Sequence, residues 1–293
     1  MKRKRFGPLV FIPGENRGKY PFCHSVYIEE AGVLIDPASD RQTLIHLKET
    51  SGVQAIWLSH AHEDHFMHLD LFDAIPLYIS EEDAPGISDL DVLMDYYGLD
   101  DEFRDFWREY LKKQFHFRPR KPTGHLHGGD IIDLGPITVE VISTPGHTPG
   151  HLSFFFRETE VLFMGDYDLT RFGPWYGDVY SSIEQTIASI SRLRDVSAKV
   201  WITSHETGVL DTKDEGLWDR YLNVITEREQ KLIDLLKYPR TLEDIVKACI
   251  IYGKPREPRA FFEFGERVHM RKHLERLKKK GAVQEEKGRY YRL

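Results

Sequence analysis

The chain has 293 residues, of which 41% are hydrophobic and 12% aromatic, and its formal net charge is −7. This composition is typical of a folded globular protein with a large core, and it excludes an intrinsically disordered chain. No apolar run approaches the roughly 18 residues of a membrane span, and two cysteines, Cys23 and Cys249, provide neither a disulfide framework nor a cysteine zinc site.

The N-terminus gives an expectation about location. Residues 1–5 are basic, but the apolar run after them is short and ends at Pro13, which argues against a secretory signal peptide. With so few cysteines, we expect a cytoplasmic protein with no membrane partner.

Short apolar runs broken by Gly, Pro and Asp predict strands at 9–12, 25–28, 33–35 and 55–58. Residues 40–50 carry Leu44, Ile45 and Leu47 behind Asp40, a pattern that predicts a helix with an aspartate cap.

A dense group of potential metal ligands follows the strand predicted at 55–58. The order is His60-Ala61-His62-Glu63-Asp64-His65, so four metal-competent side chains, His60, His62, Asp64 and His65, fall within six residues. Imidazole and carboxylate suit zinc or a similar first-row ion, and a strand end is rigid enough to deliver such ligands to one point. A solvated loop explains this density poorly.

The region after a predicted strand at 76–79 is helical and aromatic. Residues 81–117 carry apolar and aromatic side chains at helical spacing, including Leu93, Tyr97, Trp107 and Leu111. Two interpretations stay open: an amphipathic helical insertion that packs on the domain, or a lid over a pocket.

Strand patterns resume at 131–132, 137–142, 152–156, 161–164 and 199–202, and a helix is predicted at 182–193. Two blocks of strands, each closed by helices, predict an α/β layered domain that extends to about residue 215.

Three of the later strands also end at a potential ligand. His147 follows the strand at 137–142, Asp166 follows 161–164, and His205 follows 199–202. Loops at one edge of a sheet commonly carry function in α/β enzymes. A buried core histidine explains any one of these residues, but it does not explain the whole set.

The ordered set His60-x-His62-x-Asp64-His65, His147, Asp166 and His205 resembles the five-motif signature of the metallo-β-lactamase superfamily over residues 8–210. The resemblance implies a four-layer αβ/βα sandwich with two metal ions in a groove at the sheet edge. It implies that His60, His62 and His147 hold the first metal, that Asp64, His65 and His205 hold the second, and that Asp166 bridges both.

Such a ligand set predicts hydrolysis. Five neutral imidazoles and two carboxylates leave a pair of divalent cations with net positive charge for a bridging hydroxide and an anionic transition state. Asp64 is the candidate group for orienting that hydroxide.

His62 stands where the diiron flavoprotein branch carries Glu, which favours zinc, although iron and manganese stay open. The absence of a cysteine ligand argues against one antibiotic-resistance branch, and a complete ligand set argues against the persulfide dioxygenase branch with one iron.

Other polar residues carry weaker predictions. His151 is left out of the metal set, as a structural residue or as a support for the ligands. His125 and His127 are expected to be exposed turn residues, whereas His24 and Asn16 lie in loops that can reach the groove.

The loop after Asp166 supplies the candidate substrate-binding residues. Arg171 can pair with a carboxylate or phosphate, and Trp175 and Tyr176 can stack on a ligand. A packed loop held by its own aromatic side chains is the alternative.

Residues 216–293 are predicted to form a separate domain. Helices at 227–236, 241–251 and 264–280, followed by a hairpin around Lys287-Gly288, resemble a winged helix. His273-Leu274, Leu277 and Gly281 also resemble the C-terminal domain of the lactamase-beta-2-like subgroup, whose animal members are endoribonucleases.

Charge leaves the role of this domain open. Residues 254–293 hold 13 Lys and Arg against 6 Asp and Glu, a net of +7, so residues 1–253 carry −14. The basic surface either holds nucleic-acid phosphates or docks on the acidic domain or on a partner subunit of a homodimer.

Two classes of function follow from the sequence. The favoured class is a hydrolase that uses a dinuclear centre on a small-molecule ester, thioester or lactone, as in the glyoxalase II-like branch. The basic helices that clamp glutathione in true glyoxalase II are not recognisable, which argues against glutathione thioesters. The alternative is an endoribonuclease or phosphodiesterase whose C-terminal domain holds RNA.

Overall fold

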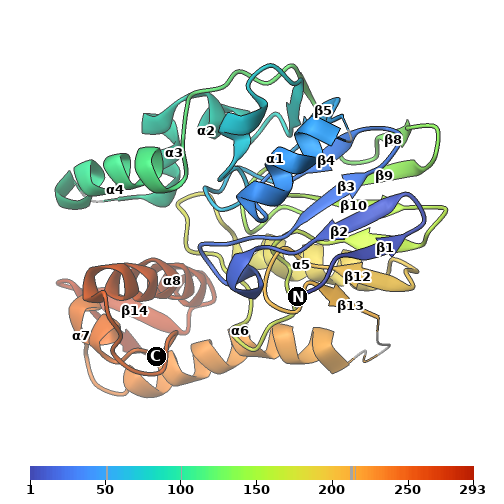
Figure 1. The fold of residues 1–293 in the computed structure, drawn as a ribbon. Coiled ribbons are helices and arrows are strands. Elements are labelled where there is room, and N and C mark those ends of the chain that lie inside the picture. Colours follow the sequence, from blue (N-terminus) through green and yellow to red (C-terminus); the bar gives the residue numbers. More distant parts are fainter. Residues whose placement is uncertain (51, 100, 212–213, 215) are drawn as a thin grey trace.

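The computed structural model describes residues 1–50, 52–99, 101–211, 214 and 216–293. Two β-sheets pack face to face in its centre, with helices covering the outer face of each sheet (Figure 1). In Figure 1, α1 (Arg41–Thr50) and the teal and green helices lie above the sheets, whereas the orange and red C-terminal helices lie below them. The predicted αβ/βα sandwich is thereby confirmed.

The first sheet is built mostly from the N-terminal third of the chain. Its described strands, in spatial order, are β1 (Lys4–Phe6), β2 (Leu9–Ile12), β3 (Ser25–Ile28), β4 (Val33–Ile35), β5 (Ala55–Trp57), β6 (Leu77–Ile79) and β7 (Gly124–His125). The strands β1 to β4 pair antiparallel, and β4 to β7 pair parallel. Parallel pairing directs the C-terminal ends of β4, β5 and β6 to the same edge.

The second sheet contains the later strands. Its described strands, in spatial order, are β13 (Val209–Leu210), β12 (Val200–Ile202), β11 (Val161–Phe163), β10 (Leu152–Phe156), β9 (Thr138–Ser143) and β8 (Ile131–Asp133). Only β11 and β12 pair parallel among these described strands. The helix α5 (Ile183–Arg194) connects them, and the Ser182 side chain caps it by accepting from the N–H of Gln185.

Side-chain alternation along the strands explains the layers. In β2, Leu9 and Phe11 face the second sheet, whereas Val10 and Ile12 face the core under α1 and the helical insertion. Opposing residues of β10, such as Phe154 and Phe156, complete the core between the sheets. Both faces of inner strands such as β2, β3, β4 and β11 are buried, so these strands read as continuous apolar runs, whereas the edge strands β1 and β8 are partly exposed.

The region predicted as a helical insertion forms three helices: α2 (Ala84–Ser88), α3 (Leu90–Tyr97) and α4 (Asp101–Gln114). Asp89 caps α3 with its carboxylate, and Gly98 ends α3 in the left-handed conformation at φ 66°. Trp107, Leu111 and Phe115 pack into the core that also covers α1. The insertion is therefore part of the domain rather than an appendage.

The C-terminal unit contains three helices and a hairpin in the predicted order. Its elements are α6 (Gly216–Leu235), α7 (Leu242–Lys247), α8 (Arg259–Lys279), β14 (Val283–Glu286) and β15 (Arg289–Arg292). The N-terminal half of α6 packs against the second sheet through Trp218 and Tyr221, and its C-terminal half packs in the core of the C-terminal unit through Leu232. The helix therefore belongs to both units. Whether the unit is a winged helix stays a prediction.

Three predicted helix boundaries in this unit differ from the structure. The helix predicted at 227–236 begins at Gly216, because Trp218 and Tyr221 pack against the second sheet. The helix predicted at 241–251 ends at Lys247. Ile251 lies beyond this end, and its backbone N–H donates to Glu266 Oε2 at 3.1 Å instead of to a helix carbonyl. The helix predicted to begin at 264 begins at Arg259, because Phe261 and Phe264 pack against the helical insertion rather than in their own unit's core.

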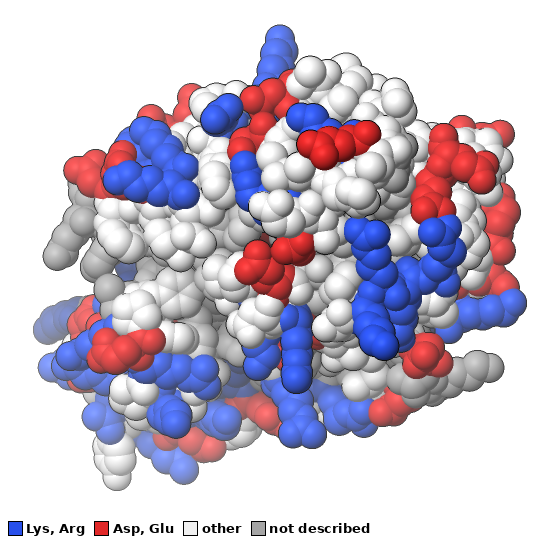
Figure 2. Space-filling model, viewed as in Figure 1, with Lys and Arg blue, Asp and Glu red and all other residues white. Residues whose placement is uncertain are grey.

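Basic side chains of α8 contact residues 179–184, which precede the C-terminal unit. Lys272 Nζ donates to the backbone oxygens of Val179 (2.6 Å) and Ser181 (2.9 Å), and Arg276 Nε donates to Glu184 at 2.7 Å. Lys and Arg also gather along the lower edge of the molecule in Figure 2, where α6 to α8 lie. Part of the basic surplus therefore serves docking between the two units.

A search of the helices in the described residues finds none that is long and apolar enough to cross a membrane.

Candidate metal centre

Three histidines from two strand ends bring one ring nitrogen each to a common point. His60 and His62 follow β5, and His147 follows β9. His62 Nδ1 lies 3.0 Å from His60 Nε2 and 2.9 Å from His147 Nε2, and the two Nε2 atoms are 3.2 Å apart. Nitrogens bound to one tetrahedral zinc at about 2.0–2.1 Å lie roughly 3.3 Å apart, so the trio has the spacing of a metal site.

The partners of the outer ring nitrogens fix the protonation of two of these rings. His147 Nδ1 lies 3.1 Å from the backbone oxygen of Trp175, and His62 Nε2 lies 2.5 Å from the Asp178 carboxylate. Both partners accept hydrogen bonds, so the proton sits on the outer nitrogen and the inner nitrogen keeps its lone pair. Two lone pairs that face each other at 2.9 Å repel unless a cation lies between them.

A second ligand set lies beside the first. His205 Nε2 lies 3.4 Å from Asp64 Oδ2 and 3.3 Å from Asp166 Oδ1. His65 Nε2 lies 2.9 Å from the same Asp166 oxygen and 3.9 Å from Asp64 Oδ1. The outer nitrogen of His65 is bonded to Asp36 at 2.9 Å, which again leaves the lone pair on the inner nitrogen.

The two carboxylate oxygens of Asp166 face different ligand sets. Oδ1 points to His65 and His205, whereas Oδ2 lies 3.2 Å from His147 Nε2 and 4.0 Å from His60 Nε2. His65 Nε2 and Asp166 Oδ1 are buried atoms that have no hydrogen-bond partner among the described residues. Because both atoms carry lone pairs, the donor set fits cations rather than a hydrogen-bonded core.

All seven sequence-predicted ligands therefore converge. His60, His62, His147 and Asp166 form one group in which a single cation can touch every member, and Asp64, His65 and His205 form an adjacent one.

Two aspartates that the sequence analysis did not single out support these ligands. Asp36 is fully buried, accepts the N–H (2.8 Å) and hydroxyl (2.7 Å) of Ser59, and holds His65. Asp178 holds His62 and accepts the Trp175 indole N–H at 3.3 Å. Asp36 directly follows β4, so the strand-end pattern could have revealed it, whereas Asp178 lies in a loop with no such signal.

A third buried aspartate, Asp83, connects the two ligand loops. Its Oδ2 accepts the Ala61 N–H (3.0 Å) and the Thr148 hydroxyl (2.7 Å), and its Oδ1 accepts the Gly150 N–H (2.8 Å). Asp83 therefore fixes the turn of His60 and His62 relative to the turn of His147.

We expect Asp178→Ala to lower the metal affinity of the first ligand set by about 10- to 100-fold, because His62 loses the group that fixes its tautomer and orientation. Competition with a chromophoric chelator measures this affinity. Asp178→Asn keeps an acceptor oxygen and should restore most of it. Asp130→Ala is the control, because Asp130 contacts His127 at 3.7 Å outside the site; an equal loss there would contradict the assignment.

His151 supports Asp166 instead of joining the ligands. Its Nδ1 lies 2.8 Å from the Thr144 hydroxyl, and its Nε2 accepts the backbone N–H of Asp166 at 3.2 Å. Gly165 lets the chain pass this ring: its φ is +60°, and a Cβ there would lie 2.4 Å from His151 Nε2. Burial lowers the pKa of His151 well below its usual value, so the ring accepts as a neutral imidazole.

The remaining candidate histidines lie outside the ligand sets. His125 and His127 are exposed, as is Asn16. His24 is buried, accepts the Gly14 N–H at 2.8 Å, and has its pKa lowered to about 4 by burial. It therefore acts as a packed neutral residue in the N-terminal loop.

A cavity of about 360 Å³ opens onto the metal ligands. Tyr97, Leu99 and Trp107 of the insertion line it, and so do residues of the loop at 168–178. Helix α8 contributes Phe261, Phe262 and Phe264, and Tyr252 lies nearby on the same unit. The cavity therefore lies between the metal ligands, the insertion and the C-terminal unit.

The three candidate substrate residues occupy different positions. Trp175 lines the cavity. Tyr176 is fully buried, and its hydroxyl lies 2.9 Å from His273 Nε2 and accepts from Arg228 at 2.8 Å. Arg171 is exposed. Neither Arg171 nor Tyr176 is among the described lining residues, so their placement gives no support to a substrate contact.

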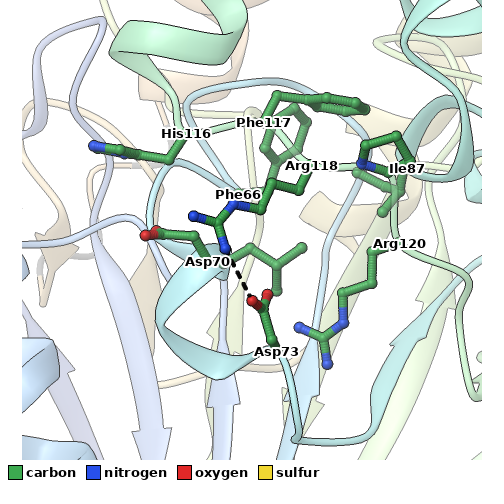
Figure 3. A pocket seen from close by; sticks show the side chains of 10 residues that line it. Phe66, Asp70, Asp73, Ile87, His116, Phe117, Arg118 and Arg120 are labelled. Carbon is green, nitrogen blue, oxygen red and sulfur yellow. Dashed lines mark hydrogen bonds and ion pairs between the residues drawn. The ribbon is translucent and has the colours of Figure 1, made fainter.

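A second cavity of about 230 Å³ is lined by residues that include Phe66, Ile87 and Phe117 (Figure 3). His116 and Asp70 lie toward one end of it, and Arg118 pairs with Asp73 at 3.2 Å. His68, Asp70 and His116 are close enough to hold a metal. However, the Arg41 guanidinium already binds both Asp70 oxygens (2.9 and 2.6 Å) and contacts His68 Nδ1 at 3.1 Å. The Arg41 guanidinium therefore already occupies the position between these three side chains that a metal ion would take.

Comparison with known proteins places this site in a family. Residues 20–205 match the family model described as "Metallo-beta-lactamase superfamily". The chain is 32% identical over 169 residues to a protein of Streptococcus pyogenes serotype M6 named "Probable metallo-hydrolase", a match that covers 56% of this chain and 66% of that one. It is 26% identical over 212 residues to a "Hydroxyacylglutathione hydrolase" of Thermosynechococcus vestitus, which covers 67% of this chain and 70% of that one. The chain thus spans slightly less than two thirds of the streptococcal protein.

A solved structure shows the same fold over nearly the whole chain. It is a metallo-β-lactamase family protein from Thermus thermophilus, with a TM-score of 0.73 at 24% identity. The match covers 98% of this chain and 99% of that one, so the shared fold includes the C-terminal unit.

Proposed function

The chain belongs to the metallo-β-lactamase superfamily, and on that basis we propose that it is a hydrolase that uses two divalent cations to cleave an ester, thioester or lactone of a small molecule. The observation that carries this proposal is the Asp166 carboxylate, whose two oxygens face separate sets of imidazole nitrogens. The name of the Thermosynechococcus relative, a hydrolase of hydroxyacylglutathione, supports a thioester as the first candidate to test.

When bound, two such cations lower the pKa of a water molecule and polarise the carbonyl oxygen of the substrate. The protein orients the ligands and excludes competing water. We assign to Asp64 the role of orienting the attacking water and accepting its proton. Asp64 lines the cavity, its Oδ1 lies 3.9 Å from His65 Nε2, and its Oδ2 lies 3.4 Å from His205 Nε2. The carboxylate is therefore close enough to the second ligand set to hold the water at that position.

The imidazole-rich ligand set favours zinc, and iron and manganese are the alternatives. Cys23 is not a ligand in this proposal, because its Sγ approaches the outer nitrogen of His65 at 3.7 Å, on the opposite side of the ring from the cation position.

The lining of the cavity favours a small molecule over RNA. Glu63, Asp168, Asp178 and Glu206 add carboxylates to those of the ligands, and no Lys or Arg occurs among the described lining residues. Two cations would bind only the phosphate that is cleaved, and the neighbouring phosphates of a nucleic acid would face these carboxylates without a basic partner. The basic side chains of the C-terminal unit instead lie on its outer surface and in its docking contacts.

Removal of the metals tests the proposal. We expect the purified protein to hydrolyse a thioester or lactone, to lose that activity on dialysis against a strong chelator, and to regain it when zinc is added. Elemental analysis of the same samples should show about two metals per chain before dialysis, and fewer than one under saturating supply would contradict a two-cation centre.

A tail variant separates this reaction from RNA cleavage. Lys279, Lys287 and Arg289 are exposed residues of the C-terminal unit. Replacing all three with serine should leave hydrolysis of the small ester within about twofold of wild type. Cleavage of RNA that is sensitive to salt and lost in this variant would instead establish the nuclease alternative.

A further inference from the structure

The start of helix α8 supplies aromatic residues that its own unit does not use. Phe261 and Phe264 pack against the hydrophobic cluster of the insertion, whereas the core of the C-terminal unit is built from other residues such as Met270 and Leu274. Phe261 and Phe262 are only partly buried, and both line the cavity over the metal ligands. The C-terminal unit therefore contributes part of the active-site surface.

Phe261 lies between aromatic rings from two other parts of the chain. Its ring stacks on Tyr20 of the N-terminal loop, with centroids 5.8 Å apart and planes at 25°. On the other side it stacks on Trp107 of α4 at 6.2 Å and 30°, and Trp107 in turn contacts Tyr97 at 6.1 Å. We call these four residues, Tyr20, Tyr97, Trp107 and Phe261, the aromatic wall. It is continuous across three segments that are distant in sequence.

Glu63 attaches the aromatic wall to the metal motif. The Tyr20 hydroxyl donates to Glu63 Oε1 at 2.7 Å, and the Tyr97 hydroxyl donates to its Oε2. Glu63 lies between the ligands His62 and Asp64 in the sequence, and its side chain is buried. Both hydroxyls are thereby turned onto the carboxylate, and the wall presents ring surface to the cavity.

The charge of the cavity limits what can lie against this surface. The described lining combines aromatic rings with carboxylates and includes no Lys or Arg. Six carboxylates line the cavity, those of Glu63, Asp64, Asp166, Asp168, Asp178 and Glu206, and two divalent cations would offset four of their charges. An anionic group on the part of the substrate that lies away from the metal ligands would therefore still meet net negative charge and would lack a basic partner. An uncharged apolar group loses little hydration free energy when it enters the cavity, and it gains contact with the aromatic rings.

We propose that the aromatic wall binds the acyl group of the substrate, and that this group is uncharged and apolar, as in a medium-chain aliphatic or an arylacetyl thioester. The inference rests on the proposed hydrolase function and adds its substrate class. A cavity of about 360 Å³ accommodates such a group beside the metal ligands. The polar leaving group would then lie toward solvent, where water can solvate a charged or a neutral group.

The test uses the full-length protein and neutral thioesters of N-acetylcysteamine that carry acetyl, butyryl, octanoyl or phenylacetyl groups. The variants are Phe261→Ala, Phe261→Leu and Phe106→Ala. Phe106 is the matched control, because it lies on the same insertion as Trp107, is 63% exposed and does not line the cavity. A second readout is independent of turnover: calorimetric binding of the S-octyl thioether, which lacks the carbonyl, to protein with and without metal.

We expect wild type to prefer octanoyl and phenylacetyl over acetyl in kcat/KM, mainly through KM. Phe261→Ala should lower kcat/KM for octanoyl by about 10- to 100-fold and leave acetyl within about threefold. Binding of the S-octyl thioether should weaken by a similar factor, and Phe261→Leu should retain most of both. Phe106→Ala should behave as wild type.

Two results would overturn the inference. One is an equal loss for acetyl and octanoyl in Phe261→Ala, which would mean that Phe261 only holds the two units together. The other is a wild type with no chain-length preference and no binding of the thioether, a result that needs no variant to fold. If wild type binds the thioether through Phe261 but hydrolyses none of the thioesters, the proposed reaction is wrong and the apolar site stands.

Discussion

Replacing Asp166 with alanine is expected to reduce hydrolysis by about 1,000-fold or more and to leave the fold intact. The large effect follows from its position, because one carboxylate faces both ligand sets. Alanine removes a ligand that both cations would share. Two cations stabilise the charge that develops in the transition state by several kcal/mol. Loss of about 4 kcal/mol of this stabilisation corresponds to roughly three orders of magnitude in rate.

The fold should tolerate the change because the structural contacts of Asp166 come from its backbone. Its N–H donates to His151, and its carbonyl oxygen accepts from the Tyr221 hydroxyl at 3.1 Å. Steady-state kinetics, metal content and a thermal melt of the same preparation check the prediction. Asp219→Ala is the control, since Asp219 lies exposed on α6 and forms an ion pair with Arg194 of α5. Turnover retained in Asp166→Ala would rule out the assigned role.

The sequence predicted the metal ligands because their signal is local. Each ligand directly follows a short apolar strand, as His205 follows β12 and Asp166 follows β11. Strands of a layered α/β domain end at common edges, so ligands at strand ends are brought together by the sheets themselves. The same logic predicted the core strands, whose two buried faces read as continuous apolar runs.

Residues whose role depends on tertiary contacts escaped prediction. Asp83 binds the backbone N–H of Ala61, 22 residues away in sequence, and Asp178 binds the ligand His62, 116 residues away, and nothing local marks either aspartate. The strands β7 and β13 are only two residues long and pair at sheet edges, so they carry no periodic pattern. Phe261 falls outside the helix predicted at 264–280, and its contact with Trp107 depends on the placement of α8 against the insertion.

The tail illustrates the limit of charge as a functional signal. A net of +7 over residues 254–293 is compatible with RNA binding and with docking. Lys272 and Arg276 contact residues 179–184, and the residues that α8 places in the cavity are aromatic, which supports docking for these two basic side chains. RNA binding by the other basic residues stays a prediction.

The second large effect concerns the contact between the two units. We expect Arg228→Met to destabilise the protein by about 2–4 kcal/mol and to lower its melting temperature by roughly 5–10 °C. Arg228 lies on α6 and is 3% exposed. Its guanidinium donates to the backbone oxygens of Phe172 (2.6 Å) and Pro174 (3.2 Å) and to the Tyr176 hydroxyl (2.8 Å). Methionine fills similar space but leaves these buried acceptors without donors.

The same variant should also weaken the metal site, because Arg228 holds the loop that carries Trp175 and Asp178. Its guanidinium lies over the Phe172 and Tyr176 rings, at 4.9 and 5.6 Å from their centroids, so the loop loses ring contacts as well as hydrogen bonds. Arg228→Lys keeps the charge without the planar fork and should fall between wild type and Arg228→Met. Arg194→Met removes a partly exposed arginine paired with Asp219 and should change the melting temperature little. If Arg228→Met melts like this control and binds metal like wild type, the assigned role of Arg228 is wrong. The contacts of α8, such as His273 with Tyr176 and Lys272 with Val179, would then hold the loop without α6.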